Sequence, residues 1–180
     1  MYGLINKAVQ ELVIQTHGEE TWRKIRLRAG LEEEEIIGLK SYPDQLTYNL
    51  LEAGSAELGI QKDKLMEMCG EKWISHTATN GYENVLNLAG SNMIDFLHHL
   101  NTIHAKITYL MPDMKPPVFR VKNEFITSVE LLYKSERDGF QPMVIGILRG
   151  LGRRFGLDVS VHNFGPDKDF PEFTHFKISW

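Results

Sequence analysis

The sequence predicts one α+β domain, in which a helical N-terminal part precedes an antiparallel sheet with one or two helices. Apolar residues recur at helical spacing as far as about residue 111. Pro112 and the pair Pro116–Pro117 end this pattern, and short strand-like runs follow. The 180 residues suffice for one domain. Within it we expect a helical subdomain at about residues 1–60 and a second part at about 61–180.

Helices are expected wherever the apolar period is bounded by residues that start or stop a helix. Ser41 is the expected N-cap of one helix, with Pro43 in its first turn. Asn92 is the expected N-cap of another, with Asp95 bonding back to it. Two helical segments are expected to end at Gly18 and at Gly30. A further helix is expected at residues 62–76, before a turn at 80–81, and another at residues 92–111.

The second part is expected to supply the sheet. Residues 118–135 are long enough for two strands, with a break at Asn123–Glu124 or at Thr127–Ser128. Residues 141–155 form a helical pattern that contains three glycines. The runs 159–164 and 173–180 predict a hairpin around residues 165–167.

Composition limits the class of protein. The net charge of −4 argues against nucleic acid or an anionic membrane as the main partner, since both attract a basic face. The single cysteine, Cys69, excludes an intramolecular disulfide and suits a reducing compartment. Cys69 is expected to be a buried, inert thiol, with a redox-sensing thiol as the alternative. No leader peptide and no apolar run of ~18 residues is visible, so we expect a cytoplasmic protein.

His104 is the most informative of the seven histidines. A helix turns by ~100° per residue, so with Leu97 at 0° His104 lies at about 340°, inside the apolar stripe of its helix. His98 lies at about 100° and His99 at about 200°, outside the stripe or at its edge. A buried imidazole is either a core residue with one hydrogen bond or a ligand. A structural zinc site needs about four ligands, whereas a haem needs only one axial imidazole from the protein, so haem is the better fit.

A possible carboxylate-binding cluster follows the Pro–Pro pair. Tyr133, Ser135 and Arg137 are spaced at i, i+2 and i+4, which places them on one face if they lie on a strand. A phenol, a hydroxyl and a guanidinium on one face suit the propionates of a haem, because arginine binds carboxylates with two hydrogen bonds. The alternative is an exposed polar strand face.

These features together resemble one known family, the haem nitric oxide/oxygen binding (H-NOX) domains, and specifically their bacterial stand-alone type. H-NOX domains are relatives of the haem domain of soluble guanylate cyclase. The resemblance covers the whole chain in the same order: Met1-Tyr2-Gly3-Leu4-Ile5-Asn6-Lys7, Leu100-Asn101-Thr102-Ile103-His104, Pro116-Pro117, Tyr133-x-Ser135-x-Arg137 and the glycine-bearing helix.

The resemblance implies a haem b (protoheme IX) buried between the helical part and the sheet. It implies that His104 is the proximal iron ligand and that Pro117 presses on the porphyrin. Tyr133, Ser135 and Arg137 are implied to bind the propionates. Five further residues are implied to line the pocket, although ordinary core packing would also explain them: Ile5, Trp73, Leu100, Met143 and Leu148.

The resemblance also implies which gases bind. Members that hold O₂ carry a distal tyrosine after the Tyr-x-Ser-x-Arg segment. Here the aligned position is Met143 or Pro142, which donate no hydrogen bond, while Gln141 and Trp73 are the donors nearby. We therefore expect ferrous haem to bind NO and CO and to exclude O₂.

The implied function is a sensor and not an enzyme. NO would weaken the Fe–His104 bond, the haem would relax, and the signal would pass to a separate histidine kinase or, second, a diguanylate cyclase, because the sequence carries no kinase or cyclase motif. Two alternatives remain open: a peroxidase-like or dioxygenase-like haem enzyme, and a binder of another apolar carboxylate such as a fatty acid or bilin.

Overall fold

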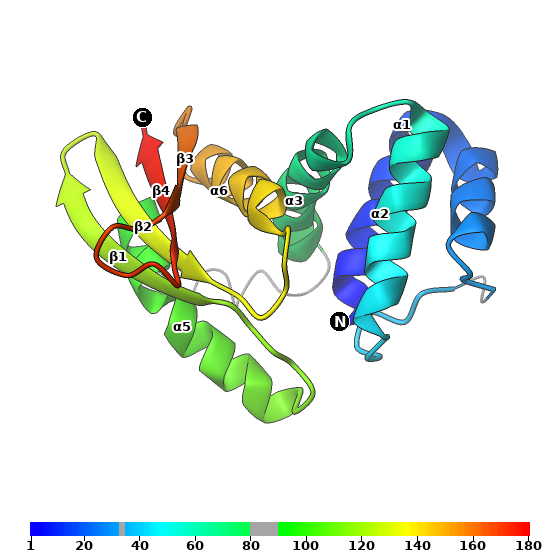
Figure 1. Cartoon of the computed structure of the whole chain (residues 1–180), viewed down its shortest axis with the longest axis horizontal. Helices are drawn as coiled ribbons and strands as arrows, with labels where there is room; N and C mark the ends of the chain where they lie inside the picture. The colour runs from blue at the N-terminus through cyan, green and yellow to red at the C-terminus, as the bar shows by residue number, and fades with distance from the viewer. Residues whose placement is uncertain (33–34, 80–89) are drawn as a thin grey trace.

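The computed structural model describes residues 1–32, 35–79 and 90–180, so the turn expected at residues 80–81 and part of the acidic run at 32–35 lie outside it. The predicted α+β fold is confirmed. Helices α1 and α2 lie on one side of the molecule, helix α5 and the sheet lie on the other, and α3 and α6 lie between them (Figure 1).

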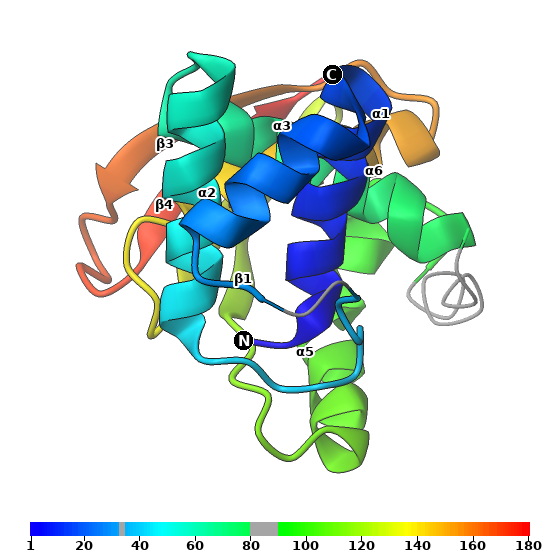
Figure 2. The same cartoon turned by 90° about the vertical axis from the view of Figure 1, so that its right-hand side faces the viewer.

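The N-terminal helices pack side by side (Figure 2). α1 (Gly3–Arg28) contains a break at Gly18, whose φ of 82° is outside the helical region, which confirms the stop expected there. α2 (Asp44–Leu58) starts later than expected. Ser41 is not its N-cap: Pro43 takes that position without a side-chain cap, and Ser41 instead pairs with Tyr2 in a short bridge.

Helices α3 (Lys62–Thr79) and α6 (Gln141–Arg154) pack closely against each other. Glycines make this possible, since a Cβ at Gly146 would lie 1.9 Å from the carbonyl oxygen of Glu67, and one at Gly70 would lie 2.2 Å from that of Met143. The glycines of the second part therefore allow two backbones to approach each other at the centre of the molecule.

Helix α5 (Met93–Leu110) carries His104 and packs against the first strand. The expected cap is confirmed, because the backbone N–H of Asp95 donates to the side chain of Asn92. The backbone leaves the helix at Met111, just before Pro112.

The sheet has four antiparallel strands in the order β1-β2-β4-β3. Their bounds are β1 (Val118–Phe125), β2 (Ser128–Lys134), β3 (Ser160–Pro166) and β4 (Thr174–Ser179). The turn between β1 and β2 falls at residues 126–127, next to the second of the two expected breaks, whereas Asn123 lies beside a register shift within the ladder. None of the helices in the described ranges is long and apolar enough to cross a membrane.

The core consists of two apolar clusters. The first is formed by the N-terminal helices, α3 and the start of α6, and the second by α5, the sheet and the rest of α6. α6 contributes to both, with Met143 in the first and Leu148 in the second. It therefore connects the helical part to the part that carries His104.

Candidate functional site

His104 makes a specific contact with the segment that follows its own helix. Its Nδ1 lies 3.2 Å from the carbonyl oxygen of Pro117, and its ring lies beside Phe119 with 6.1 Å between centroids. A carbonyl oxygen only accepts, so Nδ1 carries the proton and Nε2 keeps its lone pair. Burial lowers the pKa of His104, and the bond to Pro117 only partly opposes this. The neutral imidazole is the form that binds a metal, and a backbone acceptor on the other nitrogen is typical of a metal ligand.

The neighbouring histidines are engaged elsewhere. His98 pairs with Glu124 at 2.6 Å, and His99 Nδ1 lies 2.7 Å from the carbonyl oxygen of Asp95; both histidines are exposed. His104 is the most buried of the three, as its helical phase predicts, yet it is only half-buried. Leu100 on the same face is half-buried too, so this face of α5 offers apolar surface beyond what the sheet covers.

Tyr133 lies inside the second cluster. It is 4% exposed, and its ring lies 5.4 Å from that of Phe119. Burial raises the pKa of Tyr133, while a hydrogen bond with Ser135 acts in the opposite direction. The phenol is therefore a neutral donor, and it lies close to the ring that contacts His104.

Ser135 and Arg137 do not lie on the strand, which corrects the expectation that all three residues share one strand face. β2 ends at Lys134, because its pairing with β1 ends there and its pairing with β4 ends at Tyr133. A turn brings the residues together instead, since the backbone N–H of Arg137 donates to Ser135 Oγ at 3.0 Å.

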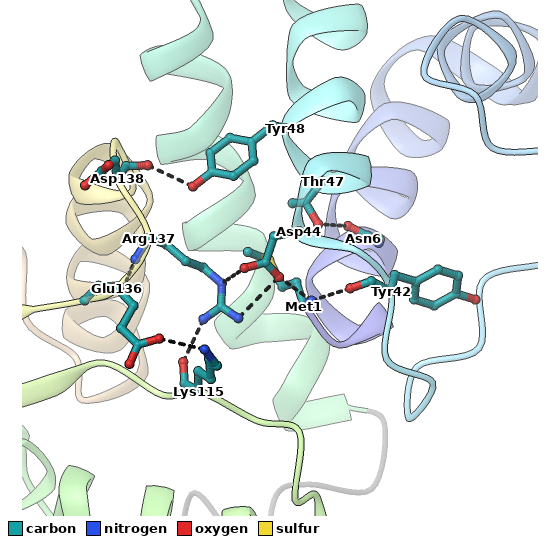
Figure 3. Close-up of polar contacts among 11 residues, drawn as sticks. Met1, Asn6, Tyr42, Asp44, Thr47, Tyr48, Lys115, Glu136, Arg137 and Asp138 are labelled. Atoms are coloured by element: carbon teal, nitrogen blue, oxygen red, sulfur yellow. Dashed lines mark hydrogen bonds and ion pairs between the residues drawn. The ribbon is translucent and has the colours of Figure 1, made fainter.

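The guanidinium of Arg137 is held by two other segments. Its Nε and Nη2 donate to the two carboxylate oxygens of Asp44 at 2.8 and 3.3 Å, and its Nη1 donates to the carbonyl oxygen of Lys115 at 2.7 Å (Figure 3). Asp44 also contacts the amino group of Met1. Burial alone would raise the pKa of Asp44, but the hydrogen bonds from Met1 and Arg137 outweigh it, so the pKa is lowered.

The expected pocket-lining residues are divided between the two clusters. Met143 belongs to the first cluster and is 3% exposed, and Ile5 packs against that cluster. Leu148 is 2% exposed in the second cluster, and Leu100 packs against that one. Trp73 is half-buried. The two groups thus come from the two sides of the molecule between which the haem is expected to lie.

A surface hollow of about 650 Å³ borders the cationic end of this site. It is lined by Arg137 and by residues of α2 such as Asp44 and Tyr48, whose hydroxyl donates to the carbonyl oxygen of Asp138 at 3.1 Å. His104 does not line this hollow. Of the three expected propionate-binding residues, only Arg137 lines the hollow.

Three residues of the site were not found from sequence. Asn101 forms two hydrogen bonds with the backbone of Phe119, one as donor and one as acceptor. The carbonyl oxygen of Lys115 and the carboxylate of Asp44 both accept from the guanidinium of Arg137. Only Asp44 left a signal, as an acidic residue directly after a helix-starting proline. The other two act through contacts between segments distant in the chain.

These observations fit a haem. Among the described residues no hydrogen bond reaches Nε2 of His104, which lies on a half-buried apolar helix face and could hold the iron of a porphyrin. Tyr133, Ser135 and Arg137 lie together at a polar end, which suits propionates. Among the described residues no group of three or more His, Cys, Asp or Glu could hold a bare metal ion.

An apolar helix face with one neutral histidine, next to a phenol, a hydroxyl and a guanidinium, suits the binding of a haem. A family model described as haem-NO-binding matches residues 2–163, and the chain belongs to this family. It is a family of haem-binding gas-sensor domains related to soluble guanylate cyclase, and the matched domain is a sensor and not a catalytic domain.

Curated relatives are soluble guanylate cyclases of animals. Soluble guanylate cyclase 89Db of Drosophila melanogaster is 29% identical over 163 residues, covering 90% of this chain and 24% of the relative. Soluble guanylate cyclase gcy-37 of Caenorhabditis elegans is 30% identical over 165 residues, covering 89% of this chain and 23% of the relative. The chain thus spans about a quarter of the length of these relatives.

Solved structures show the same fold. The unliganded Fe(II) H-NOX protein from K. algicida has a TM-score of 0.84 and 24% identity, over 99% of this chain and 96% of that one. The Fe(II)NO H-NOX protein from S. oneidensis has a TM-score of 0.87 and 14% identity, over 99% and 98%.

Proposed function

We propose that this chain is a haem-based NO sensor of the bacterial stand-alone type, located in the cytoplasm. It would bind NO and CO at ferrous haem b, exclude O₂ and signal to a separate protein. The observation that carries the proposal is the hydrogen bond from His104 Nδ1 to Pro117 at 3.2 Å, which leaves Nε2 free on an apolar face. His104 would be the iron ligand, Tyr133, Ser135 and Arg137 would hold the propionates, and Pro117 would contact the porphyrin.

The pocket would be apolar on the side where a gas binds. Met143 is buried at the start of α6, with Pro142 at one of the first two positions of that helix. Neither side chain donates a hydrogen bond, and bound O₂ needs a donor for its partly negative outer oxygen. Ile5 and Trp73 would complete this side, and Leu100 and Leu148 would line the side nearer the sheet. O₂ would be excluded if Met143 and Pro142, and not Gln141 at the first position of α6, face the bound gas.

His104 would hold the haem iron, and the haem would supply the site at which NO binding would weaken that bond. His104 is the residue that would respond. Once it is released, α5 would stay attached to β1 through Asn101 and Phe119, while the contact of His104 with Pro117 is free to change. The bond between His104 and the iron would exist only in the NO-free state. NO binding would therefore favour one conformation of the protein over the other, which a population shift requires. A histidine kinase is the first partner to test, and a diguanylate cyclase the second.

The spectrum of the reduced, haem-loaded protein tests this proposal. NO and CO should each shift the Soret band, whereas air should yield no stable oxygen complex before the iron oxidises. Met143→Tyr should create measurable O₂ binding, and Met68→Tyr, elsewhere in the first cluster, should not. A stable oxygen complex of the wild-type protein would refute the claimed gas selectivity. Absence of any Soret band would instead favour another apolar carboxylate as the ligand.

The sensor role needs a second measurement. Kinase autophosphorylation, or cyclic dinucleotide synthesis for the second partner, should change when the NO complex is added. The iron-free protein serves as the control. If the NO complex forms normally and neither activity changes with any candidate partner, the signalling part of the proposal fails.

A further inference from the structure

Asp44 joins the N-terminal helices to the expected propionate-binding segment. It is the first residue of α2, and its carboxylate receives two hydrogen bonds from Arg137, at 2.8 and 3.3 Å (Figure 3). The two residues are 93 positions apart in the chain. A paired contact of this kind fixes the plane of a guanidinium as well as its position.

A second contact fixes the same guanidinium from the other part of the molecule. Nη1 of Arg137 donates to the carbonyl oxygen of Lys115 at 2.7 Å. Lys115 lies two residues before Pro117, which accepts the hydrogen bond from His104. Arg137 therefore lies where α2 meets the short segment that contacts the expected iron ligand.

These contacts leave part of the guanidinium available. Asp44 accepts from the edge formed by Nε and Nη2, and the carbonyl oxygen of Lys115 accepts one N–H of Nη1. Within the described residues, the hydrogen bonds of Arg137 use one N–H of Nη1 and one of Nη2, which leaves one N–H on each of these nitrogens for another acceptor. A carboxylate that approaches this end would meet donors whose direction is already set.

We propose that Asp44 is a positioning residue for the carboxylate clamp: it orients Arg137 so that the remaining N–H groups can bind a haem propionate. This inference rests on the proposed function, in which Arg137 binds a propionate. Arginine loses much rotamer freedom when it is ordered. Asp44 and the Lys115 carbonyl have already ordered it, so propionate binding costs less.

Charge-neutral and length-changing variants test the inference. Haem-loaded wild type, Asp44→Asn, Asp44→Glu and Arg137→Gln are mixed with excess haem-scavenging apoprotein, and the rate of haem loss is measured from the Soret band. Glu136→Gln is the matched control, because Glu136 is next to Arg137 in the chain but pairs with the side chain of Lys115 on the surface, at 2.9 Å.

Loss of an orienting charge-assisted hydrogen bond is expected to speed haem loss by about 5-fold in Asp44→Asn. Asp44→Glu should recover part of the effect, and Glu136→Gln should match the wild type. Arg137→Gln should speed haem loss at least as much as Asp44→Asn. Adding Asp44→Asn to Arg137→Gln should have no further effect, because Asp44 acts through Arg137.

A resonance Raman spectrum separates positioning from general loosening of the fold. The propionate bending modes should shift in Asp44→Asn and stay unchanged in Glu136→Gln. If Arg137→Gln leaves haem loss unchanged, the propionate role of Arg137 fails. If Arg137→Gln speeds haem loss while Asp44→Asn does not, or if the Asp44 effect persists without Arg137, the inference about Asp44 is overturned and the propionate role stands.

Discussion

The side-chain amide of Asn101 pairs with the backbone of Phe119 in both directions, with Nδ2 donating at 2.5 Å and Oδ1 accepting at 3.0 Å. The pair joins α5 to the beginning of β1. One helical turn further on, His104 bonds to Pro117, two residues before Phe119. The position of the expected iron ligand is thus set by two adjacent contacts of α5, one with the edge strand β1 and one with the residue just before it.

Asn101→Asp should destabilise the protein, because a carboxylate keeps one acceptor but loses the donor to the Phe119 carbonyl. The expected loss in unfolding free energy is about 1–3 kcal/mol, measured by urea denaturation near neutral pH. Asn163→Asp is the control, since the exposed Asn163 accepts from the backbone N–H of Gly165 through Oδ1, an acceptor that aspartate keeps. Equal stability of wild type and Asn101→Asp would show that the amide pair does not anchor α5.

Gly146→Ala should disrupt the packing of α3 on α6. The added Cβ would lie 1.9 Å from the carbonyl oxygen of Glu67, so the two backbones must separate, at a cost of about 3 kcal/mol. Gly150→Ala is the control in the same helix, where the nearest atom would be 3.1 Å away and a smaller loss is expected. Thermal unfolding of both variants measures the difference, and a Gly146→Ala melting temperature at or above that of Gly150→Ala would contradict the close approach.

Asp167 should contribute acid-dependent stability. Its carboxylate accepts from Lys122 at 2.7 Å and is 3% exposed as a residue. The hydrogen bond from Lys122 is the main cause that lowers the pKa of Asp167 below its ordinary 3.8. A carboxyl group whose pKa is lower in the folded state than in the unfolded state stabilises the fold at every pH above the unfolded-state pKa. This contribution is lost as the pH falls through the folded-state pKa.

Asp167→Asn should therefore be less stable than the wild type near neutral pH, and the difference should shrink as the pH falls below about 3.8. Unfolding free energies from urea titrations across the acid range measure this. Asp169→Asn is the control, because Asp169 binds the same lysine at 2.9 Å but is largely exposed. A difference between wild type and Asp167→Asn that stays constant with pH would argue against a charge-based contribution.

Local patterns predicted those features of the fold that depend on local chemistry. The phase of α5 selected His104, the cap at Asn92 and the break at Gly18 were both visible in the sequence, and the order of helices and strands followed from periodicity. The start of α2 was misplaced by the competing signals of Ser41 and Pro43, since either residue can precede a helix.

The site was less predictable because its contacts join distant segments. The spacing of Tyr133, Ser135 and Arg137 suggested a strand, whereas β2 ends at Lys134 and a turn positions the last two residues. The length of a strand depends on where its neighbours stop, which local periodicity does not show. For the same reason the position of Asp44 after a helix-starting proline indicated a helix start but not its contact with Arg137, 93 positions along the chain.

The absorbance spectrum of haem-reconstituted His104→Ala tests the central claim most directly. The wild-type protein should show an intense Soret band. The variant should lose it, and added imidazole should restore it by occupying the position of the missing side chain. His98→Ala, which alters an exposed histidine six residues earlier on the same helix, should retain the wild-type spectrum. A His104→Ala variant with a wild-type Soret band in the absence of imidazole would contradict the assignment of His104 as the iron ligand.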